Sequence, residues 1–207
     1  MIRVGADPVG RRRAPLSAIV GLVLAAGGGR RYGGPKALVR HEDGRLLVER
    51  AVATLRDGGC TRIWVVLGAE SGRVRDEAQL DGAELLDNPT WKSGMGSSLR
   101  VGLAALAETD AQAVAVLLVD TPGIGPEAVT RLLAAASGGS RALLTATYKG
   151  RRGHPVILGR DHWPGVTTLA TADVGARAYL VAHAGEVQGV PCEDIADDTD
   201  LDVPPER

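Results

Sequence analysis

Apolar runs alternate with amphipathic stretches along most of this chain, and this alternation constrains the fold more than any other feature. Residues 17–24 and 113–119 are apolar without a strict two-residue alternation, which is typical of strands buried on both faces. Residues 46–57 instead repeat apolar side chains at the spacing of a helix. Strands separated by helices indicate a mostly parallel sheet, so we expect a three-layer, Rossmann-like α/β fold with helices on both faces.

The remaining elements are predicted from the same two periodicities. Further strands are expected at residues 62–67, 83–86, 142–147, 154–158 and 186–190, and further helices at residues 71–77, after residue 94, from residue 126, and at residues 176–183. Residues 17–203 are expected to form a single domain behind a disordered tail at residues 1–16. The acidic run at residues 193–202 is expected to be a solvated tail.

Composition favours a small molecule as the ligand. The 24 basic residues nearly cancel the 25 acidic ones, so no positive field favours nucleic acid or an anionic membrane. With three Trp, three Tyr and no Phe, the chain offers few rings for stacking on single-stranded bases. Its two cysteines make no disulfide framework and no four-ligand zinc site, and they suit a reducing cytoplasm.

The amino terminus imitates a secretory signal. Three arginines at residues 11–13 precede the apolar run LSAIVGLVLAA, which begins at Leu16. Cleavage at Ala26 would, however, remove the strand that presents the glycine-rich sequence described next. We therefore expect a cytoplasmic protein without membrane association, because no other run approaches the roughly 20 apolar residues that cross a bilayer.

A glycine-rich sequence, LAAGGGRRYGGPK at residues 24–36, follows the first predicted strand. Its three successive glycines permit close approaches that side chains would forbid, so backbone amides can turn toward phosphate oxygens. Arg31 adds a two-pronged donor and Lys36 a mobile point charge, the two kinds of cation that neutralise a triphosphate. We predict a triphosphate-binding loop, with a simple turn between strand and helix as the alternative.

Two common phosphate-binding patterns do not fit this loop. The Walker sequence requires Ser or Thr after its lysine, where this chain has Ala37. The dinucleotide fingerprint requires a third glycine where this chain has Tyr32, and Pro35 opposes a helix opening there. A P-loop NTPase and a Rossmann dehydrogenase are therefore disfavoured.

Several segments resemble a known family. LAAGGGRRYGGPKAL is similar to the LAAGxGxRxGxxK signature of small nucleotidyltransferases, especially the molybdenum-cofactor cytidylyltransferase group. DNPTWKSGMGSSLRVGL at residues 87–103 resembles the NPxWxxGMxSSLxxGL segment of that group, and LLVDTPGI at residues 117–124 resembles its strand-borne aspartate. RGHPV at residues 152–156 and DVGAR at residues 173–177 also look like family motifs.

The chain departs from the family pattern at three positions. Thr121 stands where Gln or Met is usual, Tyr32 where Met is common, and Gly29 where the molybdenum group often has Ser. These departures leave the glycine-rich loop intact.

The resemblance implies a fold of the nucleotide-diphospho-sugar transferase type and a set of binding residues. Those expected to hold the nucleotide are Leu24, Ala25, Ala26, Gly27, Gly28, Gly29, Gly94, Ser97 and Ser98. Small side chains there let the base or ribose approach, and the hydroxyls supply directional hydrogen bonds. For the two serines, simple helix initiation is the alternative.

Asp120 and Asp173 are the candidate ligands of Mg²⁺. Asp120 follows an apolar strand, at the end where ligands bind in open α/β sheets. Nucleotidyl transfer needs neutralised charge on the α-phosphate and on pyrophosphate, which Mg²⁺ supplies through a carboxylate or two and substrate oxygens. Together with Lys36 and Arg31, Asp120 forms the predicted catalytic set. Each aspartate has a structural alternative, because Asp120 could cap its own turn and Asp173 the helix that follows it.

We predict that the chain transfers CMP from CTP to a phosphorylated cofactor such as molybdopterin and releases pyrophosphate. Ala26 favours CTP, because guanylyl-using relatives often have Gly there. His154 and Arg177 are predicted to lie on the acceptor side, and a transient contact with a cofactor-accepting enzyme is expected. Two other functions stay open: an NAD(P)H-dependent pigment or quinoid reductase on the same scaffold, and a non-catalytic chaperone that binds a nucleotide cofactor.

Overall fold

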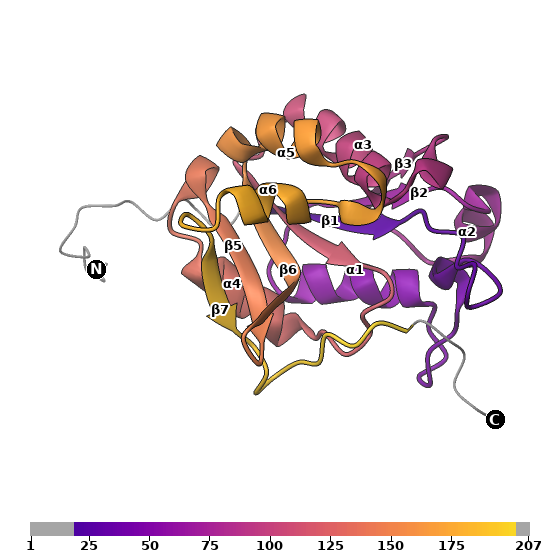
Figure 1. Ribbon diagram of the computed structural model, residues 1–207. Coiled ribbons are helices and arrows are strands. Elements are labelled where there is room, and N and C mark those ends of the chain that lie inside the picture. Colours follow the sequence, from indigo (N-terminus) through magenta and orange to yellow (C-terminus); the bar gives the residue numbers. More distant parts are fainter. Residues whose placement is uncertain (1–18, 202–207) are drawn as a thin grey trace, which may run out of the picture.

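Residues 19–201, which the computed structural model describes, build one seven-stranded sheet between two layers of helices (Figure 1). The strands are β1 (Ile19–Ala25), β2 (Ile63–Leu67), β3 (Ala83–Asp87), β4 (Ala113–Leu118), β5 (Leu143–Tyr148), β6 (Arg151–Gly159) and β7 (Gln188–Pro191). The α-helices are α1 (Leu47–Asp57), α2 (Ser71–Glu77), α3 (Met95–Ala107), α4 (Pro126–Ala135), α5 (Trp163–Leu169) and α6 (Arg177–Ala182). The predicted tail, the first two residues of the predicted 17–24 strand and Asp202 lie outside these residues.

The sheet is mostly parallel, so the predicted fold class is confirmed. Its order is β3-β2-β1-β4-β6-β5-β7, and only β6 runs antiparallel to its neighbours β4 and β5. Lys149 and Gly150 join β5 to β6 with φ angles of 52° and 78°. Two successive residues of positive φ match the right-handed twist of a tight hairpin, which explains how one strand reverses here.

The strand order reverses direction at β1, and this reversal places the site. β1 pairs in parallel with β2 on one side and with β4 on the other. In open α/β sheets such a reversal leaves a crevice beyond the carboxyl ends of the two strands. The register pairs Leu24 with Leu118, so the glycine-rich loop and the Asp120 turn leave the sheet side by side.

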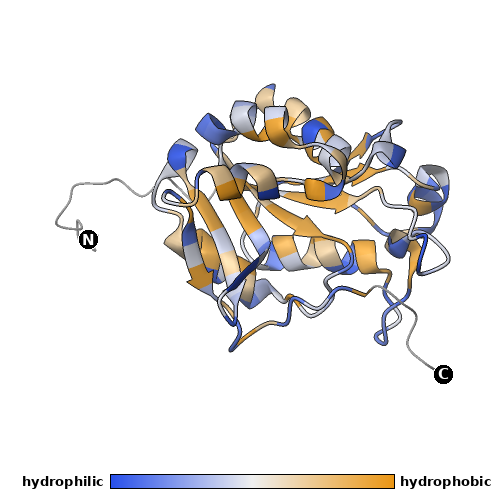
Figure 2. Cartoon of the chain, in the orientation of Figure 1, coloured by the Kyte–Doolittle hydropathy of each residue, from blue (hydrophilic) through white to orange (hydrophobic). Residues whose placement is uncertain are grey.

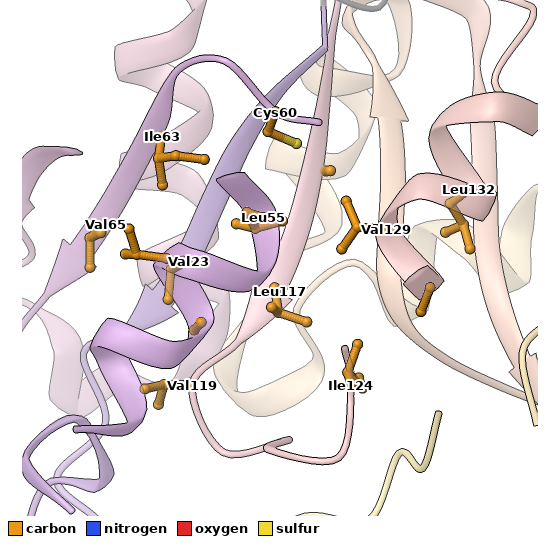
Figure 3. Close-up of a cluster of buried hydrophobic side chains, with 14 of the residues drawn as sticks. Val23, Leu55, Cys60, Ile63, Val65, Leu117, Val119, Ile124, Val129 and Leu132 are labelled. Carbon is orange, nitrogen blue, oxygen red and sulfur yellow. The ribbon is translucent and has the colours of Figure 1, made fainter. Parts of the chain in front are cut away.

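Two apolar layers hold the helices on the sheet. α1 and α4 cover one face, and α3, α5 and α6 cover the other (Figure 1). On the first face, Leu55 of α1 and Val129 of α4 lie beside Leu117 of the sheet, in the same buried cluster as Val23 and Leu132 (Figure 3). Because the strands are covered on both sides, they are largely hydrophobic along their length (Figure 2). Over the stretch from residue 19 to 201, no helix combines the length and hydrophobicity that a membrane span requires.

Helix α5 was not predicted from the sequence. Trp163 and Val166 are buried at a spacing of three residues on the face that α3 also covers. The segment contains Pro164, Gly165 and two threonines, which are weak helix formers away from the first turn. The two buried side chains, rather than intrinsic propensity, therefore account for this helix.

The acidic carboxyl-terminal run was predicted to be a solvated tail, and its described part is not. Residues 192–201, here called the C-terminal strap, return over the loop that follows β4. The Asp197 amide donates to the Gly123 carbonyl at 3.1 Å, and the Leu201 amide donates to the Asp120 carbonyl at 2.8 Å. A Cβ on Gly123 would lie 2.6 Å from the Asp197 carbonyl oxygen, so only glycine permits this approach. The charge pattern led to a wrong prediction, because the strap is held by backbone hydrogen bonds, which charge does not report.

Gly102 tests the packing of α3 on the sheet. A Cβ at this position would lie 2.6 Å from Cδ2 of the fully buried Leu22. We predict that Gly102→Val lowers the free energy of unfolding by about 2 kcal/mol, because overpacking a core costs roughly 1–3 kcal/mol. Urea denaturation measures the loss. Ala104→Val, on the exposed face of α3, is the control and should cost only about 0.5 kcal/mol; equal losses would contradict the packing explanation.

Candidate active site

A pocket of about 330 Å³ opens beyond the carboxyl ends of β1 and β4. Of the residues predicted from the sequence, it is lined by Leu24, Ala26, Gly27, Gly28, Gly29, Lys36, Gly94, Ser98, Asp120 and Asp173. They come from the glycine-rich loop, the start of α3, the end of β4 and the 3₁₀ turn Ala172–Val174. Four segments that are distant in sequence therefore face one space.

The glycine-rich loop needs its glycines for shape. Gly29 has a φ of +56°, and a Cβ there would meet the Gly34 carbonyl oxygen at 1.9 Å. The Gly29 carbonyl also accepts the Gly33 amide at 2.9 Å, which closes the turn. At Gly28 a Cβ would lie 2.9 Å from the ring of Trp91. Larger residues at positions 28 and 29 would have to open this turn.

Lys36 and Asp120 join the loop to the sheet. Lys36 Nζ donates to Asp120 Oδ2 at 2.8 Å, across 84 residues of sequence. The side chains are only 13% and 24% exposed, and partial exclusion of water strengthens such a pair. One wall of the pocket thus carries both a mobile cation suited to phosphate and a carboxylate suited to a divalent metal.

The backbone around Asp120 is fixed from two sides. The Val119 amide donates to the Leu24 carbonyl of β1 at 3.3 Å, and the C-terminal strap donates to the Asp120 carbonyl. Thr121 is 5% exposed, and its hydroxyl donates to the Leu118 carbonyl at 3.2 Å. The departure from the family pattern at Thr121 therefore serves the turn itself.

The start of α3 touches the turn that carries Asp173. Gly94 has a φ of +105°, and a Cβ on it would lie 2.5 Å from the Ala172 carbonyl oxygen. Asp173 Oδ1 accepts the Met95 amide at 3.3 Å. Asp173 therefore caps α3, across 78 residues of sequence, and no side-chain cap is found for α6, the helix that was its predicted structural alternative.

Asn88 organises the two serines of α3. It is 1% exposed, and its Nδ2 donates to Ser97 Oγ at 2.8 Å and to Ser98 Oγ at 3.0 Å. Asn88 Oδ1 accepts the amide and the hydroxyl of Thr90, each at 3.0 Å. Sequence reasoning missed Asn88 because an Asn-Pro pair signals only a loop.

A second pocket of about 530 Å³ lies between β6 and α6. His154 and Arg177, predicted on the acceptor side, both line it, as do Arg151 and Arg152. Its apolar wall consists of Val156, Val174, Leu180 and Val181. Met95 lines this pocket and the first one, so the two are neighbours.

His154 is held as a neutral imidazole. Burial lowers its pKa from 6.5 to about 4, although the negative charges of Asp120 and Asp198 partly offset this effect. Its carbonyl accepts the Tyr148 hydroxyl at 2.7 Å. At neutral pH this side chain can therefore form hydrogen bonds but supplies no positive charge to a phosphate.

Three predicted site residues do not line either pocket. Ala25 is 1% exposed and packs in the cluster under α1, because successive side chains of a strand point to opposite faces. Ser97 points into the Asn88 network, since neighbouring positions of a helix differ by about 100°. Arg31 is exposed in the turn, and Arg30 lines the first pocket instead.

Sequence reasoning also missed Trp91, Lys92 and Met95, which line the first pocket. Trp91 packs against Gly28 and Gly68. Trp91, Lys92 and Met95 all lie within residues 87–103, the segment that resembles the family, and this position was the one indication of a role in the site. The sequence alone does not tell whether a single aromatic or basic side chain in a loop faces a pocket.

The donor set fits a hard divalent cation. Asp120 and Asp173 line the same pocket, and each uses one carboxylate oxygen, toward Lys36 and Met95 respectively. Among residues 19–201, no group of three or more His, Cys, Asp or Glu side chains could hold a metal by itself. Two carboxylates suit a cation that completes its shell with water and substrate phosphate oxygens.

Comparison with known proteins identifies the family of this chain. The family described as the MobA-like NTP transferase domain matches residues 21–187. The chain belongs to this family. It is 38% identical over 195 residues to nicotine blue oxidoreductase of Paenarthrobacter nicotinovorans, covering 90% of this chain and 93% of that protein.

Two further similarities are partial or structural. A probable molybdenum cofactor guanylyltransferase of Opitutus terrae is 33% identical over 111 residues, which are 54% of this chain and 52% of that protein. The crystal structure of Rv0371c from Mycobacterium tuberculosis H37Rv in complex with manganese matches with a TM-score of 0.68 and 23% identity, over 84% of this chain and 87% of that one. The last comparison shows a shared fold. The chain thus has the nucleotidyltransferase domain of the MobA-like family.

The lowered pKa of His154 makes a prediction about stability. The unfolded chain binds this proton with a pKa near 6.5 and the folded chain near 4, so the unfolded state takes up the proton first as the pH falls. Stability from the neutral imidazole is complete above pH 6.5 and is lost toward pH 4. We expect the wild type to lose about 2 kcal/mol more than His154→Gln between pH 7.5 and 4.5. Urea denaturation at both pH values measures this, and identical losses would contradict it.

Proposed function

We propose that this protein transfers CMP from CTP to a phosphorylated cofactor such as molybdopterin. The observation that carries the proposal is the Lys36–Asp120 pair, which stands in a pocket rimmed by the glycine-rich loop. The loop amides and Lys36 bind the triphosphate, because both present donors to phosphate oxygens. Membership in the MobA-like family and the similarity to a molybdenum cofactor guanylyltransferase support this class of reaction.

Asp120 and Asp173 are proposed to hold a divalent cation, Mg²⁺ or Mn²⁺. The cation would neutralise charge on the α-phosphate and on the leaving pyrophosphate. The manganese-bound relative Rv0371c supports a divalent metal in this fold. Lys36 holds the Asp120 carboxylate in place through one oxygen and leaves the other without a partner among the described residues.

The transfer itself needs few protein groups. A phosphate oxygen of the acceptor forms a bond to the α-phosphorus of CTP, while the bond from this phosphorus to the bridging oxygen breaks and pyrophosphate departs. A phosphate monoester is already ionised at neutral pH, so no general base is required. The contribution of the chain is therefore alignment of the two phosphates and stabilisation of the spreading negative charge.

The second pocket is proposed to receive the acceptor. Arg177 lines it, and its guanidinium makes no ion pair or hydrogen bond within residues 19–201. The neighbouring apolar wall suits a ring system, and arginine suits a phosphate or other anion. For the base, the proposal of CTP rests on Ala26, a buried residue that lines the first pocket at a position where guanylyl-using relatives often have Gly.

A second candidate function is NAD(P)H-dependent reduction of a pigment or quinoid compound. The observation that favours it is the 38% identity to nicotine blue oxidoreductase over nearly the whole of both chains. The same pockets would then hold a dinucleotide and a planar acceptor. The two functions differ in their products, because only nucleotidyl transfer releases pyrophosphate.

A substrate panel separates the candidates. CTP, GTP, UTP and ATP are each incubated with the protein, Mg²⁺ or Mn²⁺, and molybdopterin, and pyrophosphate release is followed. In parallel, NADH and NADPH oxidation is followed with a quinoid dye and no triphosphate. Release of pyrophosphate with CTP above the other triphosphates supports the proposal. Silence with every triphosphate, together with oxidation of the nicotinamide, would establish the reductase instead.

Asp120→Asn is the sharpest variant for this mechanism. It keeps the shape of the side chain and the contact to Lys36 but removes the charge that holds the metal. We expect turnover to fall at least roughly 100-fold, as is common when electrostatic stabilisation of a transition state is lost. Steady-state pyrophosphate release measures it.

Asp110→Asn is the matched control. Asp110 precedes β4, at the opposite end of this strand from Asp120, and forms an exposed ion pair with Arg62. Its replacement should leave turnover within about twofold of the wild type, because exposed ion pairs contribute little. A wild-type rate in Asp120→Asn would overturn the assignment.

A further inference from the structure

Asn88 has a defined orientation, although it is buried. The Thr90 amide is a backbone group that can only donate, and it contacts one end of the Asn88 side chain at 3.0 Å. This end must be the carbonyl oxygen, so the opposite end, which faces the serines, must be the NH₂ group. Both hydrogens of that NH₂ group are used, one on Ser97 Oγ and one on Ser98 Oγ.

The two serines differ in where their own hydrogens go. Ser97 Oγ donates to the Gly94 carbonyl at 2.8 Å, so its hydrogen stays within the turn before α3. Ser98 Oγ has Asn88 as its partner and no acceptor for its own hydrogen among residues 19–201. Ser98 lines the first pocket, and Ser97 does not. A hydroxyl hydrogen is therefore left to point toward the ligand.

We infer that Asn88 is a positioning residue that makes Ser98 a hydrogen-bond donor in the nucleotide pocket. The ligand atom opposite Ser98 is consequently an acceptor, such as a keto oxygen or an unprotonated ring nitrogen of the base. Asn88 fills one of the two lone pairs of the Ser98 oxygen and holds the side chain, so the hydroxyl hydrogen, which has no acceptor among residues 19–201, is the group presented to the ligand. This inference rests on the proposed binding of a nucleoside triphosphate.

Asn88→Asp should reverse this polarity. The substitution keeps the shape of the side chain but replaces the NH₂ group with an oxygen, and the Ser98 hydroxyl then donates backward to the new carboxylate. The pocket loses its donor and presents a lone pair instead. A hydroxyl that accepts where the ligand also accepts is repulsive, so affinity should fall without any change of a residue that contacts the ligand.

A double-mutant cycle tests the inference. Binding of CTP with Mg²⁺ is measured by calorimetry for the wild type, Asn88→Asp, Ser98→Ala and the double variant. We expect each single variant to weaken Kd by roughly tenfold, since one net hydrogen bond is lost or opposed. The double variant should bind no worse than Ser98→Ala, because Asn88 acts through the hydroxyl that is already absent.

Ser93→Ala is the matched control. Ser93 is exposed and in the same loop, and its hydroxyl donates to the Thr90 carbonyl at 2.7 Å. It should bind CTP like the wild type. If Asn88→Asp does not fold, as thermal melting would reveal, Asn88→Ala takes its place in the cycle under the same criterion.

Each outcome decides something. Losses that multiply in the double variant would show a merely structural Asn88 and overturn the inference, as would unchanged affinity in either single variant. If calorimetry, extended to GTP, UTP and ATP, detects no binding of any triphosphate to the wild type, the proposed function fails and this inference fails with it. Binding by the wild type together with a non-additive cycle supports both.

Discussion

The ion pair between Lys36 and Asp120 is the contact on which the site depends. It links a loop after the first strand to a turn after the fourth, so it forms only when β1 and β4 lie side by side in the correct register. The glycines shape the loop so that Lys36 can reach this position, and the C-terminal strap fixes the backbone of Asp120. Sheet topology, loop chemistry and strap therefore converge on one partly shielded pair of charges.

The mostly parallel α/β class and most of the elements could be expected from the sequence, because buried strands and amphipathic helices leave strong periodic patterns, whereas the strand order came from the structure. β1 and β4 were found from uninterrupted apolar runs, and α1 from its spacing. Helix α5 carries no such pattern and forms through the burial of Trp163 and Val166. The strap was misjudged because acidic composition reports solubility and says nothing of backbone pairing.

The site was predictable where chemistry is local and not where it depends on partners distant in sequence. Lys36 and Asp120 stand in motifs whose residue types suit phosphate and metal, so both could be singled out. Arg31 was predicted at the site, but Arg30 lines the pocket, because the path of the turn decides which of two neighbouring arginines faces inward. Asn88 and the cap from Asp173 to Met95 need three-dimensional neighbours, and no spacing rule in the sequence connects them.

The contact between the start of α3 and the turn at residues 170–173 has a consequence for how two substrates would share this protein. Gly94 and Gly96 approach that turn so closely that neither side can shift alone, and Met95 faces both pockets. The two pockets therefore share one common wall at Met95. A residue larger than glycine at position 94 or 96 would displace this shared wall and so change both pockets, which ties the places proposed for the two substrates to one turn.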